Sequence, residues 1–457
     1  MFQTVELPLW TLLLLCAFAA VTFASHFLFP SVRWFFRKRA ERLVARLNTR
    51  LKEPIQPFKL AARKDTIMRL VHDPEVAQAI ADHAAERDIP EQVAFEKAGR
   101  YAREIVPSFS ARLYFGLATW AARWLSQGLY RVRVSGADRA ASVIGPDVTT
   151  VFVMNHRSNM DYVLVTWLMA QQTSLAYAVG EWARRWPLRP LIRAMGGYFV
   201  RRRDLNPLYR KVLSRYVQIA TRAGVTQAVF PEGRLSRDGA LQPPKLGILS
   251  YILDGYDPAG RDVVFVPVAL NYERVLEDRS LLADRLKPGA AQLSWIAVAL
   301  YFLDHLRVRM TGRFARFGYA AVTYGRPLSL HDFLQEERPD PAAAVAEALM
   351  ERIAEVLPVL PTPLVAEALI GGARDLPAIA SHLELREAAL KDTMHPVHHP
   401  NRPTAAIAET AIRLLESRGF VEFDGENVEV DDDAREILAF YARTLPLQRS
   451  SEKQNYA

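Results

Sequence analysis

The sequence predicts an α/β fold, because short β-rich runs alternate with longer helical stretches through the middle of the chain. The strands are expected at residues 132–134, 149–154, 176–179, 197–200, 226–230, 263–270 and 320–324. Polar residues gather where several of these runs end. Since an open α/β sheet binds ligands at the carboxyl ends of its strands, we expect the functional site there.

Composition limits the class of protein. The chain has 457 residues, 50% of them apolar, which suffices for two or three domains and excludes a disordered or fibrous protein. Lysine and arginine number 58 against 50 aspartates and glutamates, and the formal net charge of +8 suits nucleic acid, an anionic membrane or an acidic substrate equally well. Cys16 is the only cysteine, so no intramolecular disulfide forms and we expect no catalytic thiol.

The first unit, residues 1–52, is expected to be a membrane anchor followed by a basic amphipathic helix. Residues 7–29 are almost uninterruptedly apolar, long enough at about 1.5 Å per residue to cross roughly 30 Å of hydrocarbon. Pro30 is expected to end this helix. Basic residues follow it at Arg33, Arg37, Lys38, Arg39, Arg42, Arg46, Arg50 and Lys52. By the positive-inside rule the body then lies on the cytoplasmic side, near anionic lipid. A cleaved signal peptide and a buried core helix are the alternatives.

Helical patterns flank the β-rich region. Residues 53–129 form a helical segment, with apolar positions recurring every three or four residues. Within it, the aromatic-rich stretch 113–130, with Phe115, Trp120 and Trp124, is expected to pack in the core, and a position on the membrane is the alternative. Residues 130–330 are expected to form the α/β domain that carries the functional site. The apolar stretch 289–303 within it is too short for a second membrane crossing. We therefore expect a buried or interfacial helix there.

Residues 331–457 form a mainly helical C-terminal extension. Helices are expected from residue 341 to about 370, and the segment 395–403 reads as a linker. After it the pattern predicts a helix over 404–418, a hairpin over 420–430 and a second helix over 432–444. Nothing in this extension indicates catalysis.

The candidate catalytic pair is His156 and Asp161, separated by four residues where the apolar run 149–154 gives way to a helical pattern. This spacing can place a carboxylate behind an imidazole at a strand-to-helix turn. Such a pair can activate a hydroxyl, which is otherwise a poor nucleophile at neutral pH. No Gly-x-Ser-x-Gly elbow is present, which favours direct transfer over an acyl-enzyme. The alternative is a turn histidine bonded to the backbone.

Three further blocks follow expected strands. The block 196–203 ends in arginines, the block 230–237 is followed by Lys245, and the block 266–273 is an apolar strand ending in polar residues. Guanidinium groups bind phosphate with two parallel hydrogen bonds, so the arginines form a candidate phosphate clamp. The candidate binding residues are Arg201, Arg202, Glu232, Gly233, Arg234, Ser236, Arg237, Lys245 and Pro267. The alternative is a solvated basic face for the block 196–203, an ordinary loop for 230–237 and a core strand for 266–273.

In this order and spacing, the four blocks resemble the glycerolipid acyltransferase family, whose members move a fatty acyl chain from a thioester carrier to a phosphorylated alcohol. The blocks are similar to that family's His-(four residues)-Asp signature, its Gly-x-Phe-x-Arg-Arg block, its Phe-Pro-Glu-Gly block and its apolar-proline block. Within the family the chain looks closest to the glycerol-3-phosphate acyltransferases. Supporting details are Arg157-Ser158, Asp161-Tyr162, the segments 244–247 and 324–328, and Phe440-Tyr441-Ala442-Arg443-Thr444-Leu445. The resemblance covers about residues 100–445.

The resemblance implies a mixed sheet flanked by helices and acyl transfer to the 1-hydroxyl of glycerol 3-phosphate, forming lysophosphatidate. Acyl-CoA or acyl carrier protein is the implied co-substrate, with no other cofactor and no metal. His156 is the implied base and Asp161 its partner. The remaining implied site residues line the acceptor site or bind its phosphate, including Arg157 and Ser158. The implied location is the cytoplasmic side of the inner membrane.

One departure concerns the third block. After Glu232-Gly233 the family usually has any residue, then arginine, then serine, but here the order is Arg234, Leu235, Ser236. Leucine thus replaces the usual arginine, whose role is expected to pass to Arg234 or Arg237.

Rival functions remain at this stage. The same chemistry could act on dihydroxyacetone phosphate or a lysophosphatidate. A non-catalytic membrane-binding or nucleic-acid-binding protein would use the basic charge, although no recognition-helix motif is present and we expect no nucleic-acid partner. A metallohydrolase built on His395, His398 and His399 would lack a matching carboxylate pattern.

Overall fold

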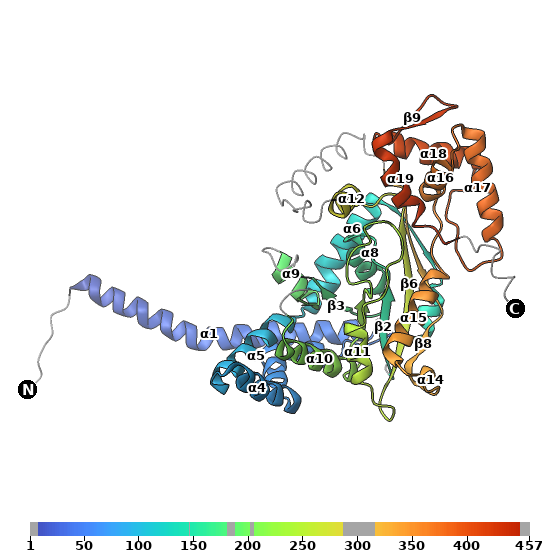
Figure 1. Cartoon of the computed structure of the whole chain (residues 1–457). Coiled ribbons are helices and arrows are strands. Elements are labelled where there is room, and N and C mark those ends of the chain that lie inside the picture. Colours follow the sequence, from blue (N-terminus) through green and yellow to red (C-terminus); the bar gives the residue numbers. More distant parts are fainter. Residues whose placement is uncertain (1–7, 146, 181–187, 202–204, 287–315, 448–457) are drawn as a thin grey trace, which may run out of the picture.

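A single mixed β-sheet forms the centre of the molecule (Figure 1). The computed structural model describes residues 8–145, 147–180, 188–201, 205–286 and 316–447. The strands are β1 (Arg131–Ser135), β2 (Val148–Met154), β3 (Ala176–Val179), β4 (Gly197–Phe199), β5 (Gln227–Val229), β6 (Asp262–Tyr272), β7 (Tyr319–Tyr324) and β8 (Leu328–Ser329). All seven expected runs are therefore strands, and β8 is an addition that the sequence reading missed.

The strand order across the sheet is β1-β7-β6-β2-β5-β3-β4, with β8 paired to β6. Neighbouring strands run parallel, except that β6 is antiparallel to β7 and to β8. The predicted α/β fold with a mixed sheet is confirmed. Because β2 lies between β5 and β6, the turn that leaves β2 sits beside the segments that follow both neighbours. The order of the strands thus brings three of the four sequence blocks together.

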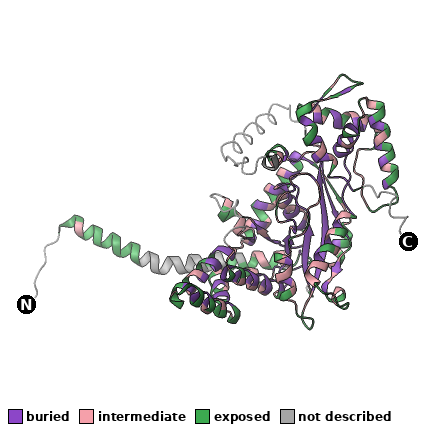
Figure 2. Ribbon diagram, in the orientation of Figure 1, coloured by how far each residue is buried: buried purple, intermediate pink, exposed green. Residues whose placement is uncertain are grey.

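Helices cover both faces of the sheet, whose strands alternate their side chains between the two (Figure 2). In β2, Phe152 and Met154 join one core, and Val151 and Val153 join the other. The first core includes residues of α6 (Thr119–Leu129), α7 (Ala137–Val143), α8 (Met160–Met169), α16 (Pro361–Ile370), α17 (Leu376–Leu390), α18 (Thr404–Glu416) and α19 (Arg435–Ala442). The second includes residues of α3 (Arg63–Val71), α4 (Pro74–Arg87), α5 (Glu91–Ile105), α10 (Pro207–Arg222), α11 (Gly247–Asp254), α14 (Leu330–Phe333) and α15 (Pro341–Ala354).

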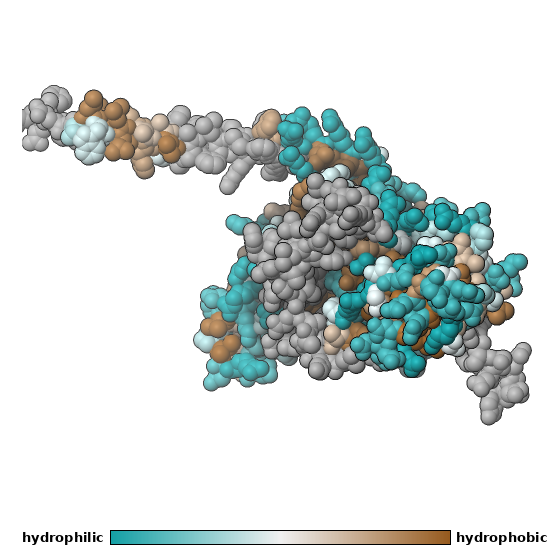
Figure 3. All heavy atoms as spheres, turned by 90° about the horizontal axis from the view of Figure 1, so that it is seen from above, coloured by the Kyte–Doolittle hydropathy of each residue, from teal (hydrophilic) through white to brown (hydrophobic). Residues whose placement is uncertain are grey.

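The first helix, α1 (Leu9–Asn48), projects away from the body of the molecule (Figure 1). The prediction that Pro30 ends it is wrong, because the helix continues through this residue. A proline suits the helical φ and removes one backbone hydrogen bond, so it does not have to terminate a helix. Apolar side chains such as Leu9, Trp10 and Phe18 are exposed along its projecting part (Figure 3).

A bilayer crossing is not found in the part of the chain that the structure describes, where none of the helices combines the necessary length and apolar character. The anchor expected at residues 7–29 therefore has no support in the described helices.

The segment after α1 is helical, as predicted. It contains α2 (Pro57–Leu60), α3, α4, α5, a π-helical turn (Leu113–Ala118) and α6. The expectation that Trp120 and Trp124 pack in the core is wrong, since they are 63% and 44% exposed. Helix α6 buries Ala122 and Leu129 instead, which leaves the tryptophans on its other face.

The C-terminal region follows the predicted order. The helix expected over 404–418 is α18, the hairpin is β9 (Val421–Phe423) with β10 (Val428–Val430), and a short 3-10 turn (Asp432–Ala434) leads into α19. In the described part of the chain, helix α9 (Leu188–Ala194) precedes β4, and helix α12 (Asp278–Leu286) follows β6. The apolar stretch 289–303 and Arg202 lie outside the described residues.

Candidate active site

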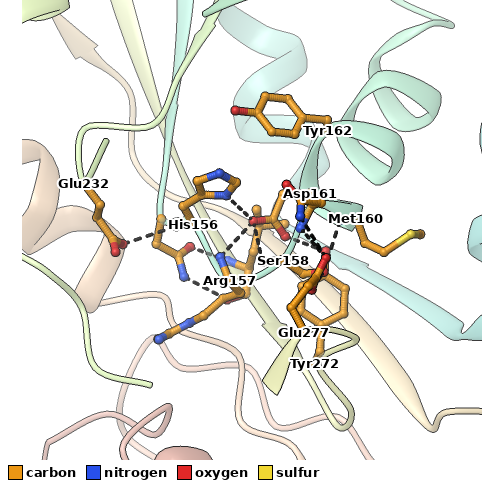
Figure 4. A network of polar contacts seen from close by, with 12 residues as sticks. His156, Arg157, Ser158, Met160, Asp161, Tyr162, Glu232, Tyr272 and Glu277 are labelled. Atoms are coloured by element: carbon orange, nitrogen blue, oxygen red, sulfur yellow. Dashed lines mark hydrogen bonds and ion pairs between the residues drawn. The ribbon is translucent and has the colours of Figure 1, made fainter. Parts of the chain in front are cut away.

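The turn between β2 and α8 carries the predicted catalytic pair (Figure 4). The Nδ1 atom of His156 lies 2.8 Å from Oδ2 of Asp161, and Asp161 is fully buried. A carboxylate in this position accepts the Nδ1 proton, which leaves Nε2 as the proton acceptor of the ring. The pair therefore has the geometry of a general base held in one tautomer.

Asp161 is itself held by donors on several sides. Its Oδ2 accepts the backbone N–H groups of Arg157 at 2.8 Å and Ser158 at 3.1 Å. Its Oδ1 accepts the hydroxyl of Tyr272, from the end of β6, at 2.7 Å. Together these bonds fix the orientation of the carboxylate. Asp161 is therefore positioned before any substrate binds.

The His156 ring has aromatic neighbours, and its turn is tied to the next strand. The ring centroid lies 4.2 Å from that of Phe230 and 5.4 Å from that of Tyr162. The side chain of Asn155 accepts the backbone N–H of Leu270 at 2.7 Å and donates to the Leu270 carbonyl at 3.0 Å. These contacts lock the start of the turn to β6.

A cavity of about 320 Å³ opens at His156. It lies at the carboxyl ends of β3, β4 and β5, where the sheet topology predicts a ligand site. The predicted site residues on its wall are His156, Arg201, Gly233 and Lys245. Much of the remaining wall is apolar, from Val179, Val200, Leu205, Leu213, Phe230, Ile248 and Tyr251. One cavity thus joins a base, two cations and an apolar surface.

Arg201 is held on this wall by partners from other helices. Glu104, at the end of α5, accepts its Nε at 2.9 Å and its Nη2 at 2.7 Å. The guanidinium also lies over the rings of Tyr101 at 5.0 Å and Tyr209 at 5.2 Å. The hydrogen bonds that Arg201 donates to Glu104 raise the pKa of Arg201 further above its usual value. The cation is therefore fixed in place, with its fork engaged by a carboxylate.

Lys245 reaches the cavity along the third block. Gly233 has φ of 70°, and a Cβ there would come within 2.9 Å of the Lys245 Cδ. The left-handed backbone at residue 233 therefore favours glycine, and a side chain there would also have to push aside the flexible end of Lys245.

Glu232 lies behind the cavity and is 2% exposed. Its Oε1 accepts the backbone N–H of His156 at 3.2 Å, which ties the third block to the catalytic turn. Burial raises the pKa of Glu232 to about 7, although the nearby Arg157 opposes the shift. Its position makes it a support for the turn.

The other predicted binding residues surround the cavity without lining it. Arg157 is buried and donates to the Gly239 carbonyl, and Ser236 is buried and donates to the Ala240 carbonyl at 2.7 Å. Ser158 donates to Glu277 at 2.7 Å. Pro267 lies within β6, Arg234 is exposed and Arg237 is half-buried. Among the described residues that form the cavity wall, none of these six appears. Arg157, Ser158 and Ser236 are thus bonded within the framework around the cavity, whereas Arg234 and Arg237 lie nearer the surface.

Sequence reasoning missed several residues of this network, namely Tyr272, Glu277, Glu104 and the structural role of Asn155. Tyr272 stands at the end of the fourth block, so the order of apolar strand and polar ending could have indicated it. Glu277 and Glu104 are brought in from distant segments by the fold. No local pattern marks them.

The histidines of the linker do not come together as a metal site. His395 contacts the Leu357 carbonyl, His398 contacts Ser135 and His399 contacts Glu387. Within the described ranges, no group of three or more His, Cys, Asp or Glu side chains could hold a metal ion.

Comparison with known proteins yields two family matches. The family model described as Acyltransferase matches residues 131–271, and the model described as Glycerol-3-phosphate acyltransferase C-terminal region matches residues 304–443. The first range holds the sheet's central strands and the His156–Asp161 turn. The second holds most of the C-terminal region.

Curated relatives carry the same name. The chain is 30% identical over 388 residues to the glycerol-3-phosphate acyltransferase of Pseudomonas fluorescens strain SBW25, covering 79% of this chain and 45% of that protein. It is 30% identical over 420 residues to that of Aeromonas hydrophila, covering 85% of this chain and 50% of that protein. The chain thus spans about half the length of the curated relatives it matches.

Among solved structures, the chain is similar to the 1-acyl-sn-glycerophosphate (LPA) acyltransferase PlsC from Thermotoga maritima. The two are 19% identical with a TM-score of 0.33, and the match covers 64% of this chain and 95% of that one. The family models and the curated relatives agree with each other: residues 131–271 match an acyltransferase domain, and residues 304–443 match the C-terminal region of glycerol-3-phosphate acyltransferases.

Proposed function

We propose that this protein transfers a fatty acyl group from acyl-CoA or acyl carrier protein to the 1-hydroxyl of glycerol 3-phosphate, forming lysophosphatidate. The observation that carries the proposal is the cavity shared by His156, Arg201 and Lys245. A base beside two cations suits an acceptor that carries a hydroxyl and a phosphate. The apolar part of the wall suits the acyl chain of the donor.

In the proposed reaction, Nε2 of His156 takes the proton of the acceptor hydroxyl. The hydroxyl oxygen attacks the carbonyl carbon of the thioester at the same time. The new ester C–O bond forms and the C–S bond breaks. The thiolate leaves and takes the proton from the imidazolium, so the base is regenerated. Asp161 stabilises the imidazolium during this cycle, which is the role a buried carboxylate has behind a catalytic histidine.

The phosphate of the acceptor would be bound by Lys245 and Arg201. Because Glu104 already holds the Arg201 guanidinium, that side chain would contribute mainly its charge and its remaining N–H donors. Lys245 would contribute a mobile ammonium. Arg202 and Arg237 would be additional ligands of the phosphate.

An acyl-transfer assay tests this function. Purified protein would be given one labelled acyl-CoA and, in separate reactions, glycerol 3-phosphate, dihydroxyacetone phosphate or a lysophosphatidate. We expect labelled lysophosphatidate with the first acceptor. Preference for either of the others would support the alternative acceptors by the same chemistry, and no product with any of them would defeat the proposal.

The matched variants for this assay are His156→Ala and His72→Ala. His72 is exposed on α3's end and lies away from the cavity, so its loss should leave turnover unchanged. His156→Ala should abolish transfer while the protein stays folded. Retained turnover in His156→Ala would show that another group is the base.

We further propose that the protein works at the cytoplasmic face of the inner membrane, in contact with anionic lipid. Apolar side chains on α1 and the exposed Leu117, Trp120 and Trp124 support contact with lipid. Flotation with vesicles of anionic or neutral lipid tests this. We expect binding that favours anionic vesicles and weakens in a Trp120→Ser, Trp124→Ser variant; equal recovery with and without vesicles would contradict it.

A further inference from the structure

The catalytic turn is connected to the C-terminal region through two adjacent carboxylates, Glu277 and Asp278, called here the Glu277–Asp278 pair. They stand between β6 and the body of α12. Each carboxylate bonds to a different part of the molecule. The pair therefore links two regions that are far apart in sequence.

Glu277 holds the catalytic turn (Figure 4). Its Oε2 accepts the Ser158 hydroxyl at 2.7 Å, and its Oε1 accepts the Asn159 backbone N–H at 3.2 Å and the Asn159 side chain at 3.0 Å. Ser158 also gives its backbone N–H to Asp161. A shift of Glu277 would therefore move the backbone that orients the partner of His156.

Asp278 is held by the C-terminal region. Arg418, which follows α18, donates to both oxygens of Asp278, and the Tyr441 hydroxyl of α19 donates to Oδ2 at 2.5 Å. Tyr441 also accepts the backbone N–H of Val275 at 3.1 Å. Asp278 and Tyr441 are almost completely buried, and the Arg418 side chain is 9% exposed. Buried charge-assisted bonds of this kind give a rigid connection.

Helix α19 also contacts other segments of the site. A Cβ on Gly239 would come within 1.9 Å of the Phe440 carbonyl oxygen, so the third block passes directly against α19. Just after α19, the Thr444 hydroxyl accepts a hydrogen bond from the side chain of Asn271, near the end of β6, at 3.3 Å. The helix and the residues that follow it thus contact the segment after β6, the end of β6 and the third block.

We propose that the C-terminal region positions the catalytic turn through the Glu277–Asp278 pair, with Arg418 and Tyr441 as positioning residues. The effect on turnover rests on the acyl transfer proposed above, whereas the positioning itself does not. Neither residue lines the cavity. Loss of the link should therefore lower kcat and change KM for glycerol 3-phosphate much less.

Amide hydrogen exchange tests the positioning without any assay of activity. The full-length protein is compared with Arg418→Met, Tyr441→Phe and Arg413→Met, and exchange is followed by mass spectrometry in peptides covering residues 155–160. Arg413 is the matched control, because its 56% exposed side chain pairs with Glu409 on the same helix. We expect faster exchange at the turn in the first two variants and wild-type exchange in Arg413→Met.

Kinetics with the same proteins separates positioning from general stability. We expect kcat to fall about tenfold in Arg418→Met, with partial recovery in Arg418→Lys, because small misplacements of a catalytic group are costly. Leu383→Ala serves as a destabilised control. Leu383 is a fully buried residue of α17, so its truncation leaves a cavity in the hydrophobic core and should lower the unfolding temperature without lowering kcat.

The outcomes are distinguishable. Wild-type exchange and wild-type kcat in Tyr441→Phe and Arg418→Met would overturn the positioning role. If Arg418→Met does not fold, Tyr441→Phe decides the matter, because it removes one oxygen atom and keeps the ring. If the wild-type protein transfers no acyl group, the proposed function fails, and the exchange experiment still decides whether the link exists.

Discussion

The two sides of the candidate site differ in how they are built. The base side lies within one turn, where His156 Nδ1 is 2.8 Å from Asp161 Oδ2. The same carboxylate oxygen accepts the backbone N–H groups of Arg157 and Ser158 in that turn. The cation side draws Arg201 from the end of β4 and Lys245 from a loop before α11. The proposed base is thus joined to its carboxylate within one turn, with Tyr272 and Glu277 as distant supports, whereas the two proposed acceptor contacts themselves come from separate segments. Mutations on the two sides should therefore affect different kinetic constants.

The largest effect is expected on the base side, from Asp161→Asn. An amide cannot accept the Nδ1 proton and the Tyr272 hydroxyl with the strength of a carboxylate, so the tautomer and orientation of His156 are lost. We expect kcat to fall between about 10² and 10⁴-fold, with a smaller change in KM for glycerol 3-phosphate. Steady-state kinetics on the folded variant measures both. An effect confined to KM would contradict the division between the two sides.

A smaller and opposite pattern is expected from Lys245→Ala. Loss of one cation should raise KM for glycerol 3-phosphate about tenfold, which corresponds to about 1.4 kcal/mol, while kcat changes little. Lys211→Ala is the control, because Lys211 pairs with Glu75 away from the cavity. If Lys245→Ala raised KM for the acyl donor alone, Lys245 would belong to the donor's site.

The departure at Leu235 gives a sharper test of the cation side. If Arg237 takes the role of the family's usual arginine, Arg237→Ala should raise KM for glycerol 3-phosphate about threefold. The same substitution should have little effect after Leu235→Arg, because the usual arginine is then restored. An equal loss of acceptor affinity in both backgrounds would rule out the compensation.

The smallest effect on turnover is expected from substitution of Glu232, which should change mainly the pH dependence of the free energy of unfolding. Burial raises the pKa of Glu232 from 4.5 to about 7, so the folded protein binds this proton more tightly than the unfolded chain. Stability from this group is present below pH 4.5 and is lost as pH rises towards 7, by an amount on the order of 3 kcal/mol. Glu232→Gln should remove that part of the slope. Chemical unfolding at several pH values measures it, and an unchanged slope would contradict the assignment.

Strands could be predicted from the sequence because each expected run is a short apolar segment bounded by helical patterns. All seven appear, and β2 and β6 send their buried side chains alternately into the two cores on either side of the sheet. The extent of α1 could not be predicted, because proline is compatible with the backbone of a helix that continues past it. The exposure of Trp120 and Trp124 could not be predicted either, because composition does not tell which face of α6 packs against the core.

The part of the candidate site that lies within one short segment of the chain could be predicted. Spacing alone placed Asp161 behind His156. It could not show that Ser158 bonds to Glu277 or that Arg201 is held by Glu104, because those partners lie over 90 residues away. Nor could it show that Arg157 and Ser236 are buried supports. Buried partners of a motif depend on how distant segments pack, and a single sequence carries no signal for them.

The measurement that most directly joins the two sides is ¹⁵N NMR of the His156 ring during titration with glycerol 3-phosphate. The account predicts that Nε2 shifts as the acceptor saturates, that Nδ1 stays near its starting value because Asp161 holds it, and that Lys245→Ala moves the midpoint to higher concentration. An Nε2 resonance that does not respond at saturating acceptor would contradict the claim that the phosphate-bound alcohol meets this base.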